Sequence, residues 1–270
     1  MTSFQKTLVA FAVLGALALA AAPAAADWNP GEPYKWLQMP YLSTEGMDVN
    51  ATWPMMLADD WQCNSPLPVT GIHFWGSWRW DKLPASDPMF SIQIWSDQPV
   101  DPKAGIFYSR PREFLWTPDP TTTTVTAREY YVFPDDQEGE GWYDPSTGEF
   151  EPNSDRVVWQ LNVDVSQSPF VQNPGEIYWL VVQASIPEDG PMVGWKSADP
   201  EYYWGDDAVW MADPGGAIPE WQELYNPMSG ESMHLSFVLT TEIPEPGTLV
   251  LLAGGLLGLL CYAWRRQKAT

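Results

Sequence analysis

The stretch VVWQLNVDV at residues 157–165 alternates apolar and polar side chains with a period of two. This alternation is typical of a strand that turns one face to a core and the other to water. Similar patterns occur at residues 72–78, 90–95 and 233–239, whereas residues 177–186 are mostly apolar on both faces, as in a central strand. We therefore predict an all-β fold, an antiparallel, jelly-roll-like β-sandwich of about eight strands with long loops.

The composition agrees with this fold class. The 270 residues include 27 Pro and 20 Gly, which are unfavourable inside helices and argue against a mainly helical protein. Hydrophobic residues make up 45% of the chain, and 17 of the residues are Trp, which is far too apolar for a disordered chain. Weaker strand patterns at residues 128–133, 193–196 and 208–211 belong to the same predicted domain.

The N-terminus has the pattern of a secretory signal peptide. Lys6 precedes an apolar run at residues 8–22, and small residues follow at 24–26. We predict that signal peptidase removes residues 1–26, so that the exported chain begins at Asp27. The exported β-domain would then occupy residues 27–242, and a separate C-terminal segment would occupy residues 243–270.

The C-terminal segment contains a predicted membrane helix at residues 248–264. At a rise of ~1.5 Å per residue it would extend about 25 Å, and flanking residues could close the gap to a hydrocarbon core of ~30 Å. Basic residues follow it at 265–268, which predicts that the C-terminus stays in the cytoplasm and the domain lies outside. The protein would therefore be anchored in the inner membrane, at least transiently.

Three features of this segment resemble the PEP-CTERM sorting signal of bacterial envelope proteins. They are the motif Pro244-Glu245-Pro246, the single membrane helix, and the terminal cluster with Arg265 and Arg266. The resemblance implies recognition by an exosortase, a membrane cysteine transpeptidase-like enzyme, and cleavage near the motif. The alternative is an ordinary C-terminal anchor in which the Pro-Glu-Pro sequence is accidental.

Several sequence motifs of the predicted domain resemble a domain family of unknown function found in secreted bacterial proteins. The resemblance covers most of residues 35–241, and it implies a domain boundary but no catalytic residue. The motifs lie at residues 35–38, 47–49, 57–60, 72–78, 139–145, 159–160, 177–180, 194–196 and 206–210.

The exported part is strongly acidic. Without Lys6, Arg265, Arg266 and Lys268 it keeps nine of the 13 basic residues and all 35 acidic ones, a net charge of −26. Such a charge repels nucleic-acid phosphates, so we expect no nucleic-acid partner. The chain has two cysteines, and one lies in the predicted membrane helix, so the domain must be stabilised by packing rather than by an internal disulfide.

Catalytic motifs are missing from the sequence. His73 and His234 are the only histidines, without the His-x-x-x-His spacing of a zinc site, and no Gly-x-Ser-x-Gly elbow occurs. We expect a protein that is not an enzyme. Two carboxylates ~5–9.5 Å apart would suffice for glycoside hydrolysis, but the sequence does not select such a pair.

An acidic loop could hold Ca²⁺. Asp136, Glu138, Glu140 and Asp144 follow part of the spacing of a calcium loop, in which hard oxygen ligands suit the ion. Thr147 stands where an EF-hand requires a bidentate Glu, and no flanking helices are predicted, so the loop is not an EF-hand.

Exposed tryptophans could stack on sugar rings. Trp75, Trp78, Trp80 and Trp142 are the candidates, although aromatic residues at strand spacing usually belong to the core.

The leading hypothesis is therefore a non-enzymatic envelope or extracellular-matrix protein that signal peptidase and an exosortase process. The first alternative is a Ca²⁺-assisted carbohydrate-binding module for extracellular polysaccharide, and the second is a carboxylate-dependent glycoside hydrolase.

Overall fold

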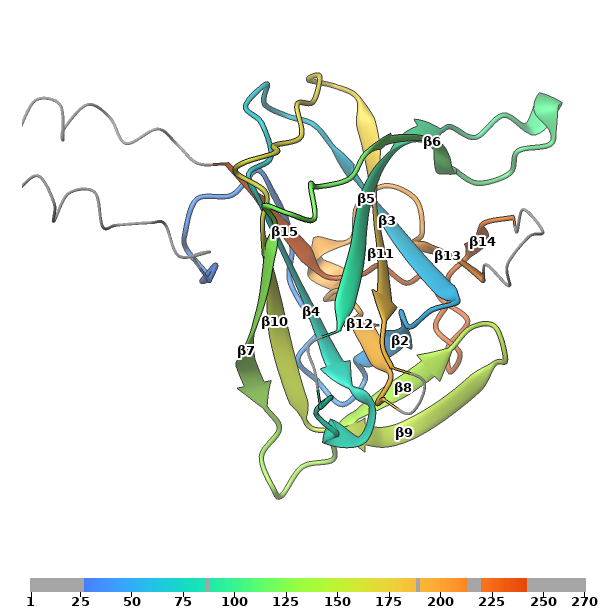
Figure 1. The fold of residues 1–270 in the computed structure, drawn as a ribbon. Coiled ribbons are helices and arrows are strands. Elements are labelled where there is room, and N and C mark those ends of the chain that lie inside the picture. Colours follow the sequence, from blue (N-terminus) through green and yellow to red (C-terminus); the bar gives the residue numbers. More distant parts are fainter. Residues whose placement is uncertain (1–26, 86–87, 188–189, 213–219, 242–270) are drawn as a thin grey trace, which may run out of the picture.

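The computed structural model describes residues 27–85, 88–187, 190–212 and 220–241. They form an all-β fold of two curled sheets with three short 3₁₀ turns (Figure 1). The all-β class predicted from the alternation is confirmed. The described residues contain fifteen strands rather than about eight, because segments that lack a clean alternation also pair as short strands.

The larger sheet has nine strands. They are β1 (Trp36–Gln38), β2 (Met47–Asn50), β4 (Gly71–Trp78), β7 (Thr124–Val132), β8 (Glu140–Asp144), β9 (Glu149–Asp155), β10 (Val157–Asp164), β12 (Val193–Lys196) and β15 (Phe237–Thr240). The long strand β4 organises this sheet. It pairs with β10 along one edge and with β15 and then β12 along the other.

The smaller sheet has six strands, in the order β14-β13-β3-β11-β5-β6. They are β3 (Met55–Gln62), β5 (Met89–Gln98), β6 (Arg110–Trp116), β11 (Ile177–Ser185), β13 (Val209–Ala212) and β14 (Gln222–Glu223). The 3₁₀ turns are η1 (Arg79–Asp81), η2 (Pro102–Ala104) and η3 (Pro200–Tyr202).

The main core lies between the two sheets and contains apolar side chains from both. Phe74 and Leu161 come from the larger sheet, and Leu57, Ile94 and Leu180 come from the smaller one. Further apolar clusters pack outside these layers, and every residue of β4 is buried. The burial of both faces of β4 explains why its sequence is rich in aromatic residues on both faces.

The pairing of β2 with β8 is the one parallel pairing among the named strands of the described residues. It attaches the hairpin β8–β9, seen at the lower right of Figure 1, to the edge of the larger sheet. The turn of this hairpin contains Gly148 at a φ of 73°, a left-handed conformation that glycine adopts without strain. This attachment positions the candidate site.

Candidate metal centre

Two cross-strand pairs of charged residues meet where the hairpin joins the sheet. Lys196 on β12 lies opposite Asp48 on β2, and Glu140 on β8 lies opposite Asp155 on β9. Directly opposite residues in antiparallel strands carry their side chains on the same face. Because β2 pairs with β8, the two pairs come together in one cluster.

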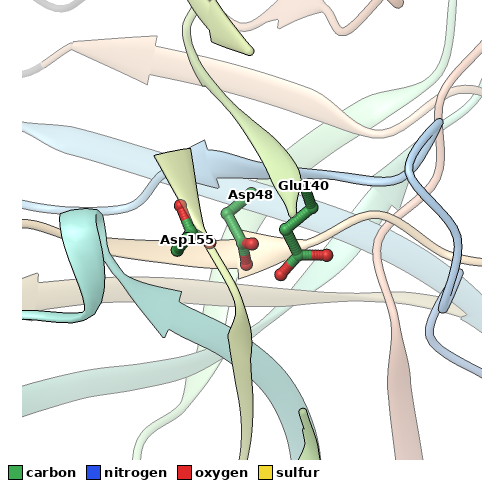
Figure 2. Close-up of side chains that lie close together, drawn as sticks. All are labelled: Asp48, Glu140 and Asp155. Atoms are coloured by element: carbon green, nitrogen blue, oxygen red, sulfur yellow. The ribbon is translucent and has the colours of Figure 1, made fainter. Parts of the chain in front are cut away.

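The three acidic side chains of this cluster form a compact group, which we call the carboxylate trio: Asp48, Glu140 and Asp155. One carboxylate oxygen from each lies within 4.8 Å of those from the other two. In the view of Figure 2 the carboxyl group of Asp48 lies between the other two. Their exposed fractions are 0%, 0% and 1%, so the trio is inside the protein.

Glu140 is the one member of the trio with hydrogen-bond donors. The Lys196 ammonium group, itself fully buried, donates to Oε2 of Glu140 and forms an ion pair with it. The Ser77 hydroxyl donates to Oε1 of Glu140 at 3.0 Å. All four carboxylate oxygens of Asp48 and Asp155 are buried without a donor in the described part of the chain.

Burial makes ionisation of the trio costly. It raises the pKa of Asp48 to about 7, against the opposing charge of Lys196. Burial and the neighbouring charge of Glu140 raise the pKa of Asp155 to about 7. Burial and the charge of Asp48 also hold the pKa of Glu140 well above its usual range, although Lys196 opposes this shift. The cluster therefore favours whatever brings positive charge to it, either protons or a cation.

Glycine makes the close approach at this site sterically feasible. A Cβ atom on Gly194 would lie 2.6 Å from Cβ of Asp48 and 2.8 Å from the ring of Trp142, closer than real Cβ contacts come. With hydrogen there instead, the buried ring of Trp142 and the side chain of Asp48 can both lie close to β12. Arg79 covers Trp142 in turn, with its guanidinium carbon 5.6 Å from the ring centroid.

The acidic loop predicted to hold Ca²⁺ does not bring its four candidates together. Asp136 and Glu138 are exposed on the loop before β8. Asp144 accepts hydrogen bonds from Asn50 Nδ2 at 2.9 Å and from Ser146. Glu140 alone points inward, because its position in β8 places it on the buried face opposite Asp155.

The sequence patterns did not single out Asp48 and Asp155, because the alternation around Asp48 is only four residues long and the segment that ends at Asp155 has no apolar alternation. The strand β2 reads MDVN and is buried at all four positions, and Asp155 ends a strand that is largely polar. A charged residue inside a predicted strand was the one sequence feature that could have indicated this buried cluster. Lys196 ends the predicted strand at 193–196. A lysine that is buried in a strand requires an acidic partner.

Three of the four tryptophans predicted as sugar platforms are buried. Trp75 lies under Trp28 and Tyr130, with ring centroids 6.1 Å and 5.3 Å away. Trp78 packs against Trp159, and the buried ring of Trp142 lies beside Gly194 on β12. Their ring faces therefore contact protein rather than solvent, because outer layers cover both faces of β4 and the edge near β8.

Trp80 is the exposed member of the four, with 48% of its surface accessible. Its indole N–H donates to Glu151 Oε1 at 3.0 Å. The cations of Arg79 and Lys82 lie 4.6 Å and 4.5 Å from its ring centroid, so cation–π contacts already occupy the ring.

The two histidines have structural partners. His73 Nδ1 lies 2.6 Å from Oδ1 of Asn162, and burial lowers the pKa of His73. The His234 ring is tilted against that of Tyr203, with centroids 4.4 Å apart, and His234 Nδ1 lies 3.5 Å from Oδ1 of Asp59. Burial opposes protonation of His234, but the charge and hydrogen bond of Asp59 raise its pKa.

A second acidic group surrounds Asp60 on β3. Burial, and then the charge of Asp59, raise the pKa of Asp60 to about 9, and Asp206 and Asp97 add to this. The backbone N–H of Asp206 donates to Asp60 and opposes the shift, but Oδ1 of Asp60 is buried without a partner. The folded protein therefore favours the protonated form of Asp60.

We expect the stability of Asp60→Asn relative to the wild type to increase by up to about 1.4 kcal/mol for each pH unit between pH 5 and pH 8. A carboxyl group whose pKa is raised on folding binds protons more tightly in the folded state, so its contribution to stability is lost as pH rises from about 4 to 9. The gain should shrink toward pH 5. Chemical denaturation at both pH values measures it, with exposed Asp135→Asn as the control. An equal gain at both pH values would contradict the raised pKa.

The comparisons with known proteins identify the domain and its tail. Residues 34–240 match the family model of the domain of unknown function DUF7901. The chain belongs to this family. Residues 242–267 match the PEP-CTERM protein-sorting motif, as the resemblance of the tail predicted. No curated protein and no solved structure matches the chain.

The DUF7901 match covers every member of the carboxylate trio and Lys196. The PEP-CTERM match begins directly after the last described strand. It implies that the protein is exported, processed by an exosortase-type system and anchored transiently in the membrane through its C-terminal end.

The sorting-motif residues Pro244, Glu245, Pro246, Arg265 and Arg266 lie outside the described residues, as do the predicted membrane helix and signal peptide. Within the part that the structure describes, no helix is long and apolar enough to span a bilayer.

Proposed function

We propose that this DUF7901 protein is a non-enzymatic component of the cell envelope or extracellular matrix, delivered by signal peptidase and an exosortase. The observation that carries the proposal is the PEP-CTERM match at residues 242–267, placed directly after an acidic, closely packed β-domain. The high negative charge keeps such a domain soluble among crowded envelope components.

The first residues after the predicted cleavage site support an exported chain that begins at Asp27. Trp28 is buried, and its carbonyl oxygen accepts hydrogen bonds from Arg128 and Gln160. Oδ1 of Asp27 accepts a hydrogen bond from Asn162 at 3.0 Å. The chain thus joins the fold immediately after residue 26, and removal of the signal peptide would leave the domain whole.

The two alternatives have weaker support. A glycoside hydrolase needs carboxyl groups that reach the substrate, and the carboxylate trio is buried. A carbohydrate platform needs free aromatic faces, and of the four predicted tryptophans Trp80 alone is exposed, with two cations over its ring. A structural role requires neither feature.

The sorting step can be tested with Glu245→Ala in the native host. We expect the variant to accumulate as an unprocessed, membrane-bound form, because the substitution removes the charged residue of the Pro244-Glu245-Pro246 sequence. Immunoblots of membrane and envelope fractions measure the mass and location of the protein.

The matched control is Glu231→Ala, which removes the same charge from an exposed position outside the matched sorting segment. If Glu245→Ala were processed at the wild-type rate and reached the wild-type location, Glu245 would not act in sorting, and the C-terminal segment would be an ordinary membrane anchor. N-terminal sequencing of the same material is expected to begin at Asp27.

A further inference from the structure

We propose that the carboxylate trio, Asp48, Glu140 and Asp155, is a buried binding site for one Ca²⁺ ion. This inference goes beyond the sorting function, since it concerns a ligand of the β-domain itself. It also differs from the sequence-based prediction of a calcium loop, with which it shares Glu140 alone.

The charge of the cluster calls for a divalent cation. With all three carboxyl groups ionised and Lys196 protonated, three negative charges face one positive charge, a balance of −2 inside the protein. Buried charges in proteins are normally paired or bound to metals, because isolated charges are costly to desolvate. One divalent ion would bring the balance to zero.

The hydrogen bonds of the cluster indicate where a cation would bind. Lys196 and Ser77 satisfy Glu140, so the protein already supplies partners for this residue. Asp48 and Asp155 are both buried, and their four carboxylate oxygens have no donor among the described residues. Buried polar atoms in native proteins nearly always have a partner, so an unpaired set of this size indicates a ligand.

The donor atoms and their spacing select the kind of ion. The trio offers oxygen ligands, without nitrogen or sulfur, and such sites suit hard cations rather than zinc. Ca²⁺–oxygen distances of ~2.3–2.6 Å place opposite ligands ~4.6–5.2 Å apart, a span that accommodates oxygens within 4.8 Å of one another. Mg²⁺ requires a tighter octahedron and keeps several waters, which a fully buried site accommodates poorly.

A bound ion would fasten the β8–β9 hairpin to the sheet. Asp48 belongs to β2, whereas Glu140 and Asp155 belong to the two strands of the hairpin. The hairpin is joined to β2 by a register of three residue pairs only. Ligands from both sides of this junction would make its closure depend on Ca²⁺, which exported modules bind with Kd values of ~10⁻⁴–10⁻³ M.

The test uses the full chain, purified in detergent, stripped with EDTA and then titrated with CaCl₂. At a Ca²⁺ concentration ~100-fold above Kd we expect Tm to rise by about 5–10 °C, because the ion binds the folded state alone. The double variant Asp48→Asn/Asp155→Asn is expected to show no rise. The control Asp136→Asn/Glu138→Gln removes two exposed acidic groups from the adjacent loop and should respond as the wild type does.

Two further measurements keep the proposal testable if the double variant does not fold. Metal analysis of wild-type protein equilibrated with Ca²⁺ should find one ion per chain, and Ca²⁺ should slow amide hydrogen exchange in residues 140–155. An unchanged Tm together with no retained ion would overturn the proposal and leave a trio neutralised by protons. If the loop control lost the rise in Tm with Ca²⁺, the ion would bind at the loop, which would also overturn the proposal. None of these outcomes depends on sorting, which Glu245→Ala tests separately.

Discussion

Replacing Lys196 by methionine is expected to lower the free energy of unfolding by about 3–5 kcal/mol. Lys196 is fully buried and donates to Glu140, and it is the one cation in contact with the carboxylate trio among the described residues. Methionine has a similar length but no charge, so the substitution leaves Glu140 buried without its ionic partner. Breaking a buried ion pair from one side is costly for that reason.

Chemical denaturation in the presence of EDTA measures this loss, with the exposed Lys103→Met as the matched control. The double variant Lys196→Met/Glu140→Gln should regain part of the stability, because it removes the unpaired charge together with its partner. If Lys196→Met were as stable as Lys103→Met, the ion pair would not contribute to the stability of the fold.

The variant Trp195→Ala is expected to destabilise the domain by about 3–5 kcal/mol as well, by opening a cavity between the sheets. The Trp195 ring is fully buried, 5.9 Å from that of Phe74 and 6.2 Å from that of Phe237. Its indole N–H donates to the backbone oxygen of Ser236 at 2.8 Å, so the substitution also removes a buried hydrogen bond.

Denaturation curves of wild type and variant give the difference in stability directly. The control is Phe107→Ala, which removes an aromatic ring that is 74% exposed and should change stability by less than about 0.5 kcal/mol. Similar effects of the two substitutions would contradict the placement of Trp195 in the core. Trp195 adjoins Lys196 on β12, yet the two variants probe opposite faces of the strand.

Strand prediction succeeded where a strand has an apolar face of its own. The patterns at residues 72–78, 157–165 and 177–186 correspond to β4, β10 and β11. The pattern at 233–239 yields a shorter strand, β15, because residues before Phe237 form isolated bridges and single hydrogen bonds instead of a continuous ladder. Alternation reports burial of one face, and it carries no information on the partner strand.

The candidate site was predicted in part, for a related reason. Glu140 was selected as a cation ligand from its spacing to Asp136, Glu138 and Asp144, which is a local property of the chain. Its neighbours in space are Asp48 and Asp155. Spacing along the chain predicts a site when one loop supplies the ligands, and it fails when separate strands supply them.

The sequence by itself determined the β-class of the domain, its acidity and the PEP-CTERM tail, because period, composition and a contiguous motif are all local properties. Tertiary structure alone decided which tryptophans are covered and which acidic groups meet. Lys196 and Glu140 are 56 positions apart and come into contact only through the pairing of β12, β2 and β8. Strand pairing depends on packing over the whole domain, so the trio forms only when β2, β8, β9 and β12 pair within the larger sheet.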